Sequence, residues 1–265
     1  MYSLYLAFFY KLGLSAVCVG MLSGIISTFI SFKRKSFVVH SLSHTMLISG
    51  VFAKCLGIPG ILGECLINVL ICNSIHYAET HYDNASNLFA SMSGLSALGI
   101  LLLSLDQSLY VSPFYGSFWF MSKDQLLGLS LLVLAFLIFT KFWGRIYIMR
   151  SISQELYEHV ESSAYALLNF AFYTLLALSC TLLSKATGVF LLNASLVLPG
   201  MIALQWVGDI IPNLCVSVGV SVSALLLSLF ISANYDIALG TILALILVSL
   251  YFARTLYLTV NSYDS

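Results

Sequence analysis

The chain has 265 residues, of which 60% are apolar and 8% are charged, and its formal net charge at pH 7 is zero. A typical soluble domain carries about 25% charged residues, so the composition excludes that class and indicates a polytopic membrane protein. Because the net charge is zero and residues 33–35 form the one short basic cluster, nucleic acid is not expected as a partner. The cluster fits a membrane edge in contact with lipid. Six scattered cysteines form no CxxC pair, which argues against a disulfide framework or a thiolate zinc site.

Apolar runs of about 20 residues, the length that crosses a bilayer, follow one another along the chain. We expect an all-α transmembrane bundle of about eight or nine spans, forming one domain over residues 1–265 because no loop is long enough for another. The expected spans lie near residues 8–32, 38–57, 60–78, 86–107, 124–148, 163–183, 186–206, 212–232 and 236–257. Runs 38–57 and 186–206 contain polar, Gly or Pro residues, and such broken or short helices line cavities.

Lysine and arginine residues gather at the ends of three expected spans, which fall on the same side of the bundle. They are Lys33, Arg34, Lys35, Lys141, Arg145, Arg150 and Arg254. Because short cytoplasmic loops are enriched in Lys and Arg, we expect this side to face the cytoplasm and the N-terminus to lie outside. Lys54 and Lys185, at opposite-side ends, are a weaker set.

Two imidazoles, His40 and His44, lie just inside the basic cluster. Residues four apart on a helix share a face and lie about 6 Å from one another, so both rings can point into one space. Ionisable groups inside a bilayer are costly and usually line a polar path, so the pair predicts part of a route for a cation. A histidine in a span is also commonly a hydrogen-bonded structural residue, and that alternative stays open for both.

Other polar residues in or near the expected spans allow two interpretations each. His76 and His81, near Glu79, are candidates for an exit site for released metal, although a solvated loop explains them more simply. Glu64 and Asn68 are four residues apart, and such a polar pair holds helices together as readily as it takes part in transport.

The segment 150–161 is the longest connection on the expected cytoplasmic side. Ser153, followed by Gln154 and Glu155, favours a helix start, because a serine caps the first turn and an acid complements the helix dipole. We therefore expect a short helix on the cytoplasmic face near 151–161, with a solvated turn as the alternative.

Motifs for nucleotide binding or catalysis are missing from the sequence. It contains no GxxxxGK[ST] loop, no HExxH helix and no GxSxG elbow. The sequence therefore gives no support for an enzyme, and any ATPase that drives transport is expected to be another chain.

Several short motifs occur in one order between residues 8 and 255. They are Gly20-x-x-Ser-Gly24, Phe29, Lys33-Arg34, His40-Ser-Leu-Ser-His44, Gly57-Ile-Pro59, Asp83-Asn-Ala85, Tyr115-Gly-Ser117, Ser151-Ile-Ser-Gln-Glu-Leu156 and Gly188-Val189 through Leu198-Pro199. In order and spacing the chain resembles the permeases of ATP-binding-cassette (ABC) importers for zinc, manganese and iron. Each motif alone is weak, because small-residue motifs are common in membrane helices.

The resemblance implies the helical architecture of metal and vitamin B12 importers and a location in the bacterial cell membrane. It implies a pore between two copies of the chain, two cytoplasmic ATPase subunits and an extracytoplasmic metal-binding protein. The chain itself offers only small-residue faces, such as Gly20 with Gly24, for contact with a second copy. No cofactor is expected; the metal is the cargo.

The resemblance also suggests roles for particular residues. His44 matches the histidine of the family's D-A-L-S-H motif and His40 stands at its Asp, so both are candidate ligands of a transient pore site. The ATPase subunits are expected to grip the coupling segment at Ser153, Gln154, Glu155, Leu156, Glu158 and His159. Candidate pore or broken-helix residues are Gly188, Asn193, Ser195 and Pro199.

Three positions depart from the family pattern. His40 replaces a carboxylate with an imidazole, which moves ligand preference away from hard cations and toward zinc. Gln154 stands where the coupling segment usually has Asp-Pro, and Asp236 through Thr241 lacks the two prolines usual there, which puts the local bends in doubt.

We therefore expect the permease subunit of an ATP-driven importer for divalent metal ions, with zinc as the favoured cargo. A manganese or iron permease of the same family is the alternative closest to it, followed by a permease for chelated metal or vitamin B12. A gradient-driven secondary transporter or channel is a further alternative, which predicts flux without an ATPase. The last alternative is a membrane scaffold or enzyme, for which the sequence contains no reactive set of residues.

Overall fold

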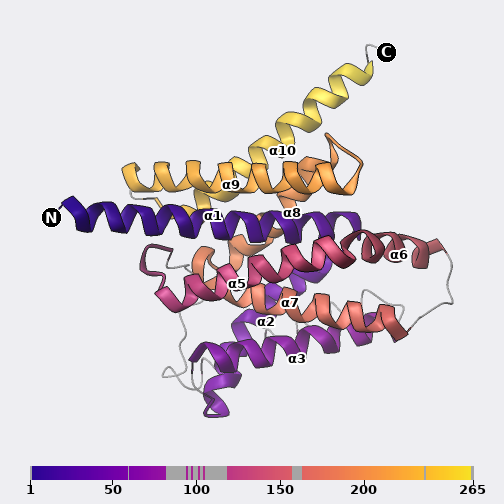
Figure 1. Ribbon diagram of the computed structural model, residues 1–265, viewed down its shortest axis with the longest axis horizontal. Coiled ribbons are helices and arrows are strands. Elements are labelled where there is room, and N and C mark those ends of the chain that lie inside the picture. The colour runs from indigo at the N-terminus through magenta and orange to yellow at the C-terminus, as the bar shows by residue number, and fades with distance from the viewer. Residues whose placement is uncertain are drawn as a thin grey trace.

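The computed structural model describes residues 2–58, 60–81, 118–156, 163–235 and 237–263, together with positions 94, 97, 101 and 104. All regular elements in these ranges are helices (Figure 1). Their bounds are α1 Tyr2–Phe32, α2 Ser36–Cys55, α3 Gly60–His81, the 3-10 turn η2 Phe118–Phe120, α5 Lys123–Phe139, the π-helical turn η3 Thr140–Gly144, α6 Arg145–Leu156, α7 Ser163–Thr187, α8 Val189–Leu204, α9 Ile210–Tyr235 and α10 Leu239–Tyr263. The span expected near 86–107 falls largely outside the described residues.

Six of the described helices are long and apolar enough to cross a membrane. These spans are Tyr10–Phe32, Gly60–Tyr77, Lys123–Arg150, Tyr165–Thr187, Ile210–Tyr235 and Leu239–Val260. The predicted all-helical bundle is confirmed for the described chain, whereas eight or nine spans are not. Helix α2 is not among the six, and the apolar helix α8, with 16 residues, is too short to be counted with them.

Helix α1 lies in the middle of the bundle, between α8 and α9 on one side and α5 on the other (Figure 1). Over an 18-residue stretch of its span Tyr10–Phe32, 72% of the residues are buried, so this part of α1 exposes little surface to lipid. Helices α2 and α3 pack against each other and against α7, which in turn packs against α5.

Small residues let the backbones of α1 and α9 approach closely. A Cβ atom added at Gly24 would lie 2.6 Å from the Cα of Val218, and one added at Gly20 would lie 2.8 Å from the Cα of Val222. The Ser217 hydroxyl donates to the Gly24 carbonyl oxygen at 2.8 Å. Both glycines therefore face α9 of the same chain, and the expectation that they present a face to a second copy is wrong.

Helices α5 and α6 form one long rod, joined by the π turn Thr140–Gly144. Gly144 is buried, and a Cβ there would lie 3.3 Å from the ring carbon Cζ of Phe29. Beyond Gly144, α6 continues without a break from Arg145 to Leu156, because its sequence contains no Gly or Pro and Ile148 is buried. Ser153 lies inside α6 and does not begin a helix. The predicted helix near 151–161 extends past the described residues and stays a prediction.

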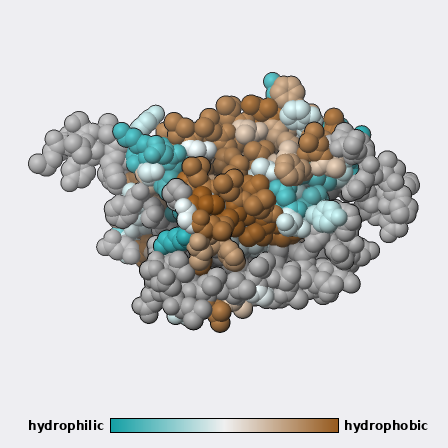
Figure 2. Space-filling model, turned by 90° about the horizontal axis from the view of Figure 1, so that it is seen from below, coloured by the Kyte–Doolittle hydropathy of each residue, from teal (hydrophilic) through white to brown (hydrophobic). Residues whose placement is uncertain are grey.

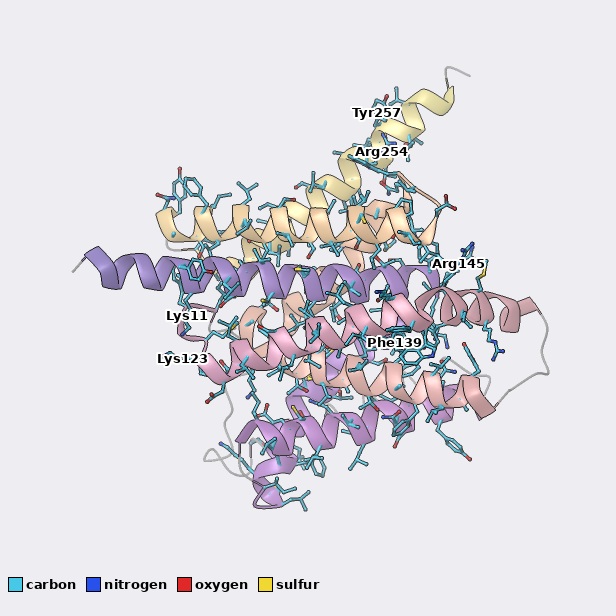
Figure 3. The ribbon with its side chains drawn as sticks, in the orientation of Figure 1. Lys11, Lys123, Phe139, Arg145, Arg254 and Tyr257 are labelled. Atoms are coloured by element: carbon cyan, nitrogen blue, oxygen red, sulfur yellow. The ribbon has the colours of Figure 1, made fainter. Side chains whose placement is uncertain are left out.

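The basic residues separate toward the two ends of the bundle. Lys11 and Lys123 lie near one end, and Arg145 and Arg254 lie toward the other, as the orientation analysis predicts (Figure 3). A brown apolar zone occupies the centre of the face in Figure 2, with hydrophilic surface on either side of it. Lys33 is the exception, because only 5% of it is exposed and it is no anchor at the membrane edge.

Replacing Gly24 with alanine is expected to lower stability by about 1–3 kcal/mol, because the new methyl group would force α1 away from the backbone of α9. Gly13→Ala on the same helix is the matched control, since a Cβ at Gly13 meets nothing within 4 Å. Thermal unfolding of both variants in detergent checks this, and an equal melting temperature for the two would contradict the close-packing argument.

Candidate functional site

Polar side chains from α2 and α8 meet at His40. The His40 ring is exposed, and its Nδ1 lies 3.3 Å from Nδ2 of Asn193 on α8. The Ser43 hydroxyl, one turn further along α2, donates to Oδ1 of the same amide at 2.6 Å. Asn193 therefore links two residues of the histidine motif to the short helix α8.

The orientation of the Asn193 amide decides the state of His40. When Nδ2 donates, Nδ1 of His40 accepts, and a neutral ring then carries its proton on Nε2. A metal ion needs an unprotonated ring nitrogen, so it can take Nδ1 only after the amide leaves, or Nε2 only after the proton has moved. Binding of a cation at His40 and the Asn193–His40 hydrogen bond therefore exclude one another.

His44 lies one turn after His40 in α2, as predicted, but its side chain is outside what the structure describes. The expected pairing of the two rings thus stays a prediction. Within the described residues no group of three or more His, Cys, Asp or Glu side chains could hold a metal ion.

Helix α8 is held in place by its first residues and by a contact with α1. Gly188, with φ of +89°, makes the one-residue turn between α7 and α8, a conformation that L side chains rarely adopt. Pro199 lies inside α8 and does not end it. Pro199 has no backbone N–H to donate. The N–H of the next residue, Gly200, donates to the Ser27 hydroxyl at 2.6 Å, and that hydroxyl donates to the Val197 carbonyl oxygen at 3.0 Å.

The four candidate pore residues therefore differ in what they do. Asn193 reaches His40, whereas the buried Ser195 donates to the Leu192 carbonyl within α8. Gly188 makes the turn before α8, and Pro199 lies within the helix beside its contact with α1. Among the four, Asn193 is the residue that joins the site.

The predicted coupling segment is described only in part. Ser153, Gln154, Glu155 and Leu156 form the last turn of α6, and their side chains lie outside the description. Glu158 and His159 lie outside the described residues, so the role of this segment stays a prediction.

The polar pair on α3 holds helices together. Nζ of Lys185 on α7 lies 2.8 Å from a carboxylate oxygen of Glu64, and Nδ2 of Asn68 donates to the Thr181 hydroxyl at 2.9 Å. These contacts tie α3 to α7, which confirms the interhelical interpretation. His76 stacks on Tyr173 of α7 with ring centroids 4.3 Å apart, so it too is a packing residue in this structure.

A buried cluster around Lys33 escaped the sequence analysis. Lys33 ends among aromatic rings of the α5–α6 rod and α7, and its Nζ donates to the Tyr147 hydroxyl at 2.6 Å. The available signal was the recurrence of aromatic residues within the expected spans 124–148 and 163–183, at Phe139, Tyr147 and Phe172. That pattern alone does not say which cation the rings surround.

A bundle whose described part contains six helices long and apolar enough to cross a membrane defines a multi-pass membrane protein. The model of the ABC 3 transport family matches residues 6–258, and the chain belongs to this family. The resemblance to ABC metal permeases is thereby confirmed, as is a multi-pass location in the bacterial cell membrane.

Similar proteins extend over nearly the whole chain. The chelated iron transport system membrane protein YfeD of Yersinia pestis is 25% identical over 247 residues, covering 92% of this chain and 83% of that protein. The manganese transport system membrane protein MntC of Halalkalibacterium halodurans is 22% identical over 249 residues, covering 89% and 82%. In fold the chain resembles PsaBC from Streptococcus pneumoniae in complex with Fab, with a TM-score of 0.73 at 21% identity, covering 93% of this chain and 90% of that one.

Lys185→Met is expected to destabilise the protein by about 1–2 kcal/mol, because it leaves the carboxylate of Glu64 without its cation. The effect stays below that of a fully buried pair since 29% of the Lys185 side chain is exposed. Adding Glu64→Gln should restore most of the loss. Melting temperatures in detergent test this, and a double variant no more stable than Lys185→Met would show that the two charges do not act as a pair.

Proposed function

We propose that this chain is the membrane-spanning permease subunit of an ATP-driven importer of divalent metal ions, with zinc as its preferred cargo. The observation that carries the proposal is the contact between His40 and Asn193 in a chain of the ABC 3 transport family. It gives a cation-capable imidazole a partner on α8, the helix fastened to the central helix α1.

The ligand type favours zinc. A neutral imidazole suits zinc, whereas carboxylate and carbonyl oxygens suit manganese. His40 supplies an imidazole, and His44 stands one turn away on the same helix. An ion that enters takes a His40 nitrogen in place of the Asn193 amide, so loading of the site loosens α2 from α8.

The proposed assembly has two copies of the chain, two ATPase subunits on the cytoplasmic side and an extracytoplasmic protein that delivers the ion. Family membership and the fold shared with PsaBC support it. The ATPase subunits engage α6 and the residues that follow it, at the end of the bundle where Arg145 lies (Figure 3).

Manganese or iron is the second candidate cargo, and the names of similar proteins favour it. YfeD is named for chelated iron transport and MntC for manganese transport. A gradient-driven transporter is the remaining alternative, and membership of the ABC 3 family counts against it.

His44→Ala and His40→Ala are each expected to reduce zinc uptake by about tenfold or more, because each removes a ligand of the transient site. Cells that lack the protein, complemented at equal expression and grown under zinc or manganese limitation, are measured by elemental analysis. The same change at His76 tests the exit-site alternative. Full rescue by His44→Ala would return that residue to a structural role, and loss of uptake in His76→Ala alone would move the site to α3.

His40→Asp is expected to shift preference from zinc toward manganese by about tenfold, since it restores an oxygen donor at this position. Competitive uptake of radioactive zinc and manganese by wild type and variant measures the ratio. If the wild type already prefers manganese, the selectivity argument from the imidazole is overturned while the importer assignment stands.

A further inference from the structure

The charged end of Lys33 is enclosed at the end of α1. Only 5% of the residue is exposed, and its Nζ donates to the Tyr147 hydroxyl at 2.6 Å and to Oδ1 of Asn169 at 3.4 Å. The same atom lies 4.1 Å from the ring centroid of Tyr147 and 5.4 Å from that of Phe172. These residues belong to α6 and α7, so one ammonium group joins three helices.

A cation at this position carries an energetic cost. Transfer of a charge into a low-dielectric interior is costly, and replacement of a buried charged group by an apolar one of similar size is often neutral or stabilising. Aromatic faces and two acceptors offset part of the cost. The position of this ammonium group between three helices therefore points to a role in holding them together.

The helix that Lys33 contacts is the one predicted to meet the ATPase. Tyr147 lies in the first turn of α6, and its ring is completely buried. The same helix ends at Leu156, within the predicted coupling segment. Because a helix moves as a rod, a displacement of its last turn reaches Tyr147.

On its other side, the described side chains at the start of α6 and the start of α9 lie on either side of an open space. A cavity of about 440 Å3 lies there, lined by Phe32, Arg145, Met149 and residues 208–212 at the start of α9. The contacts through Lys33 and the aromatic rings give movement of α6 a route to α1.

Helix α1 is in turn fastened to the helices of the candidate site. Ser27 bonds to the backbone of α8 at Val197 and Gly200, and the hydroxyls of Ser23 and Ser221 of α9 lie 2.6 Å apart. Asn193 of α8 holds His40. The contacts therefore run without a gap from α6 through Lys33 and α1 to the site.

We propose that Lys33 is a positioning residue, an ammonium clamp that carries movement of α6 to α1 and so couples ATP hydrolysis to opening of the metal path. The inference rests on the proposed function. In this arrangement the lysine touches neither the ion nor the nucleotide; it keeps α1 and α6 moving together.

The test is the number of ions transported per ATP hydrolysed, measured with radioactive zinc and manganese in proteoliposomes that hold the full chain with its ATPase subunits. Lys33→Met keeps the apolar stem and removes the ammonium group, and we expect the ratio to fall by about tenfold while ATP hydrolysis continues. Tyr147→Phe removes one oxygen and should lower the ratio by about fivefold. Arg34→Met is the matched control, since it removes an exposed charge from the same cluster and should leave the ratio unchanged.

The double variant Lys33→Met with Tyr147→Phe separates coupling from stability. If both residues act through one bond, the double variant behaves like Lys33→Met alone, whereas independent effects multiply. A ratio within about twofold of wild type in Lys33→Met, or an equal fall in Arg34→Met, overturns the clamp. If Lys33→Met does not reach the membrane, Tyr147→Phe decides, and an unchanged ratio in that variant overturns it as well.

Failure of the proposed function gives a different result. Wild-type vesicles that take up ions equally well without ATP would overturn the importer assignment, whatever the variants do. Wild-type vesicles that couple uptake to ATP, together with variants that couple equally well, would overturn the clamp alone.

Discussion

The rest of the structure depends on the close contact of α1 with α8 and α9. Gly20 and Gly24 allow backbone approach, and the hydroxyls of Ser23 and Ser27 satisfy polar groups across the two interfaces. In lipid there is no hydrophobic drive between helices, so close packing and interhelical hydrogen bonds supply the attraction. A helix placed in this way at the centre determines the position of every neighbour, including the short helix α8.

The candidate site follows from that placement. Helix α8 brings Asn193 to His40 because Gly188 turns the chain sharply after α7 and Ser27 holds the segment around Pro199. In the proposed transport site an ion competes with the Asn193 amide for His40. Weak contacts suit transport, because an ion that binds tightly does not leave.

Polar groups elsewhere in the bundle act at helix contacts. The pair Glu64 and Lys185 joins α3 to α7, and Lys33 joins α1 to α6 and α7. One is an ion pair open to water at the lysine, and the other is a cation enclosed by rings. Lys185 and Lys33 have the same side chain. Their different surroundings give Lys185 a structural role and make Lys33 a candidate for transmitting movement.

The sequence by itself determined the membrane class, the helical bundle, most helix positions and the family, because apolar length and motif order are local properties of the chain. It also located the histidine motif and the polar pair on α3. Only the tertiary structure decided that Gly20 and Gly24 face α9, that Lys33 is enclosed, that α6 continues through Ser153 and that Asn193 is the partner of His40. These depend on which residues distant in sequence meet in space, and neither hydropathy nor helical periodicity carries that information.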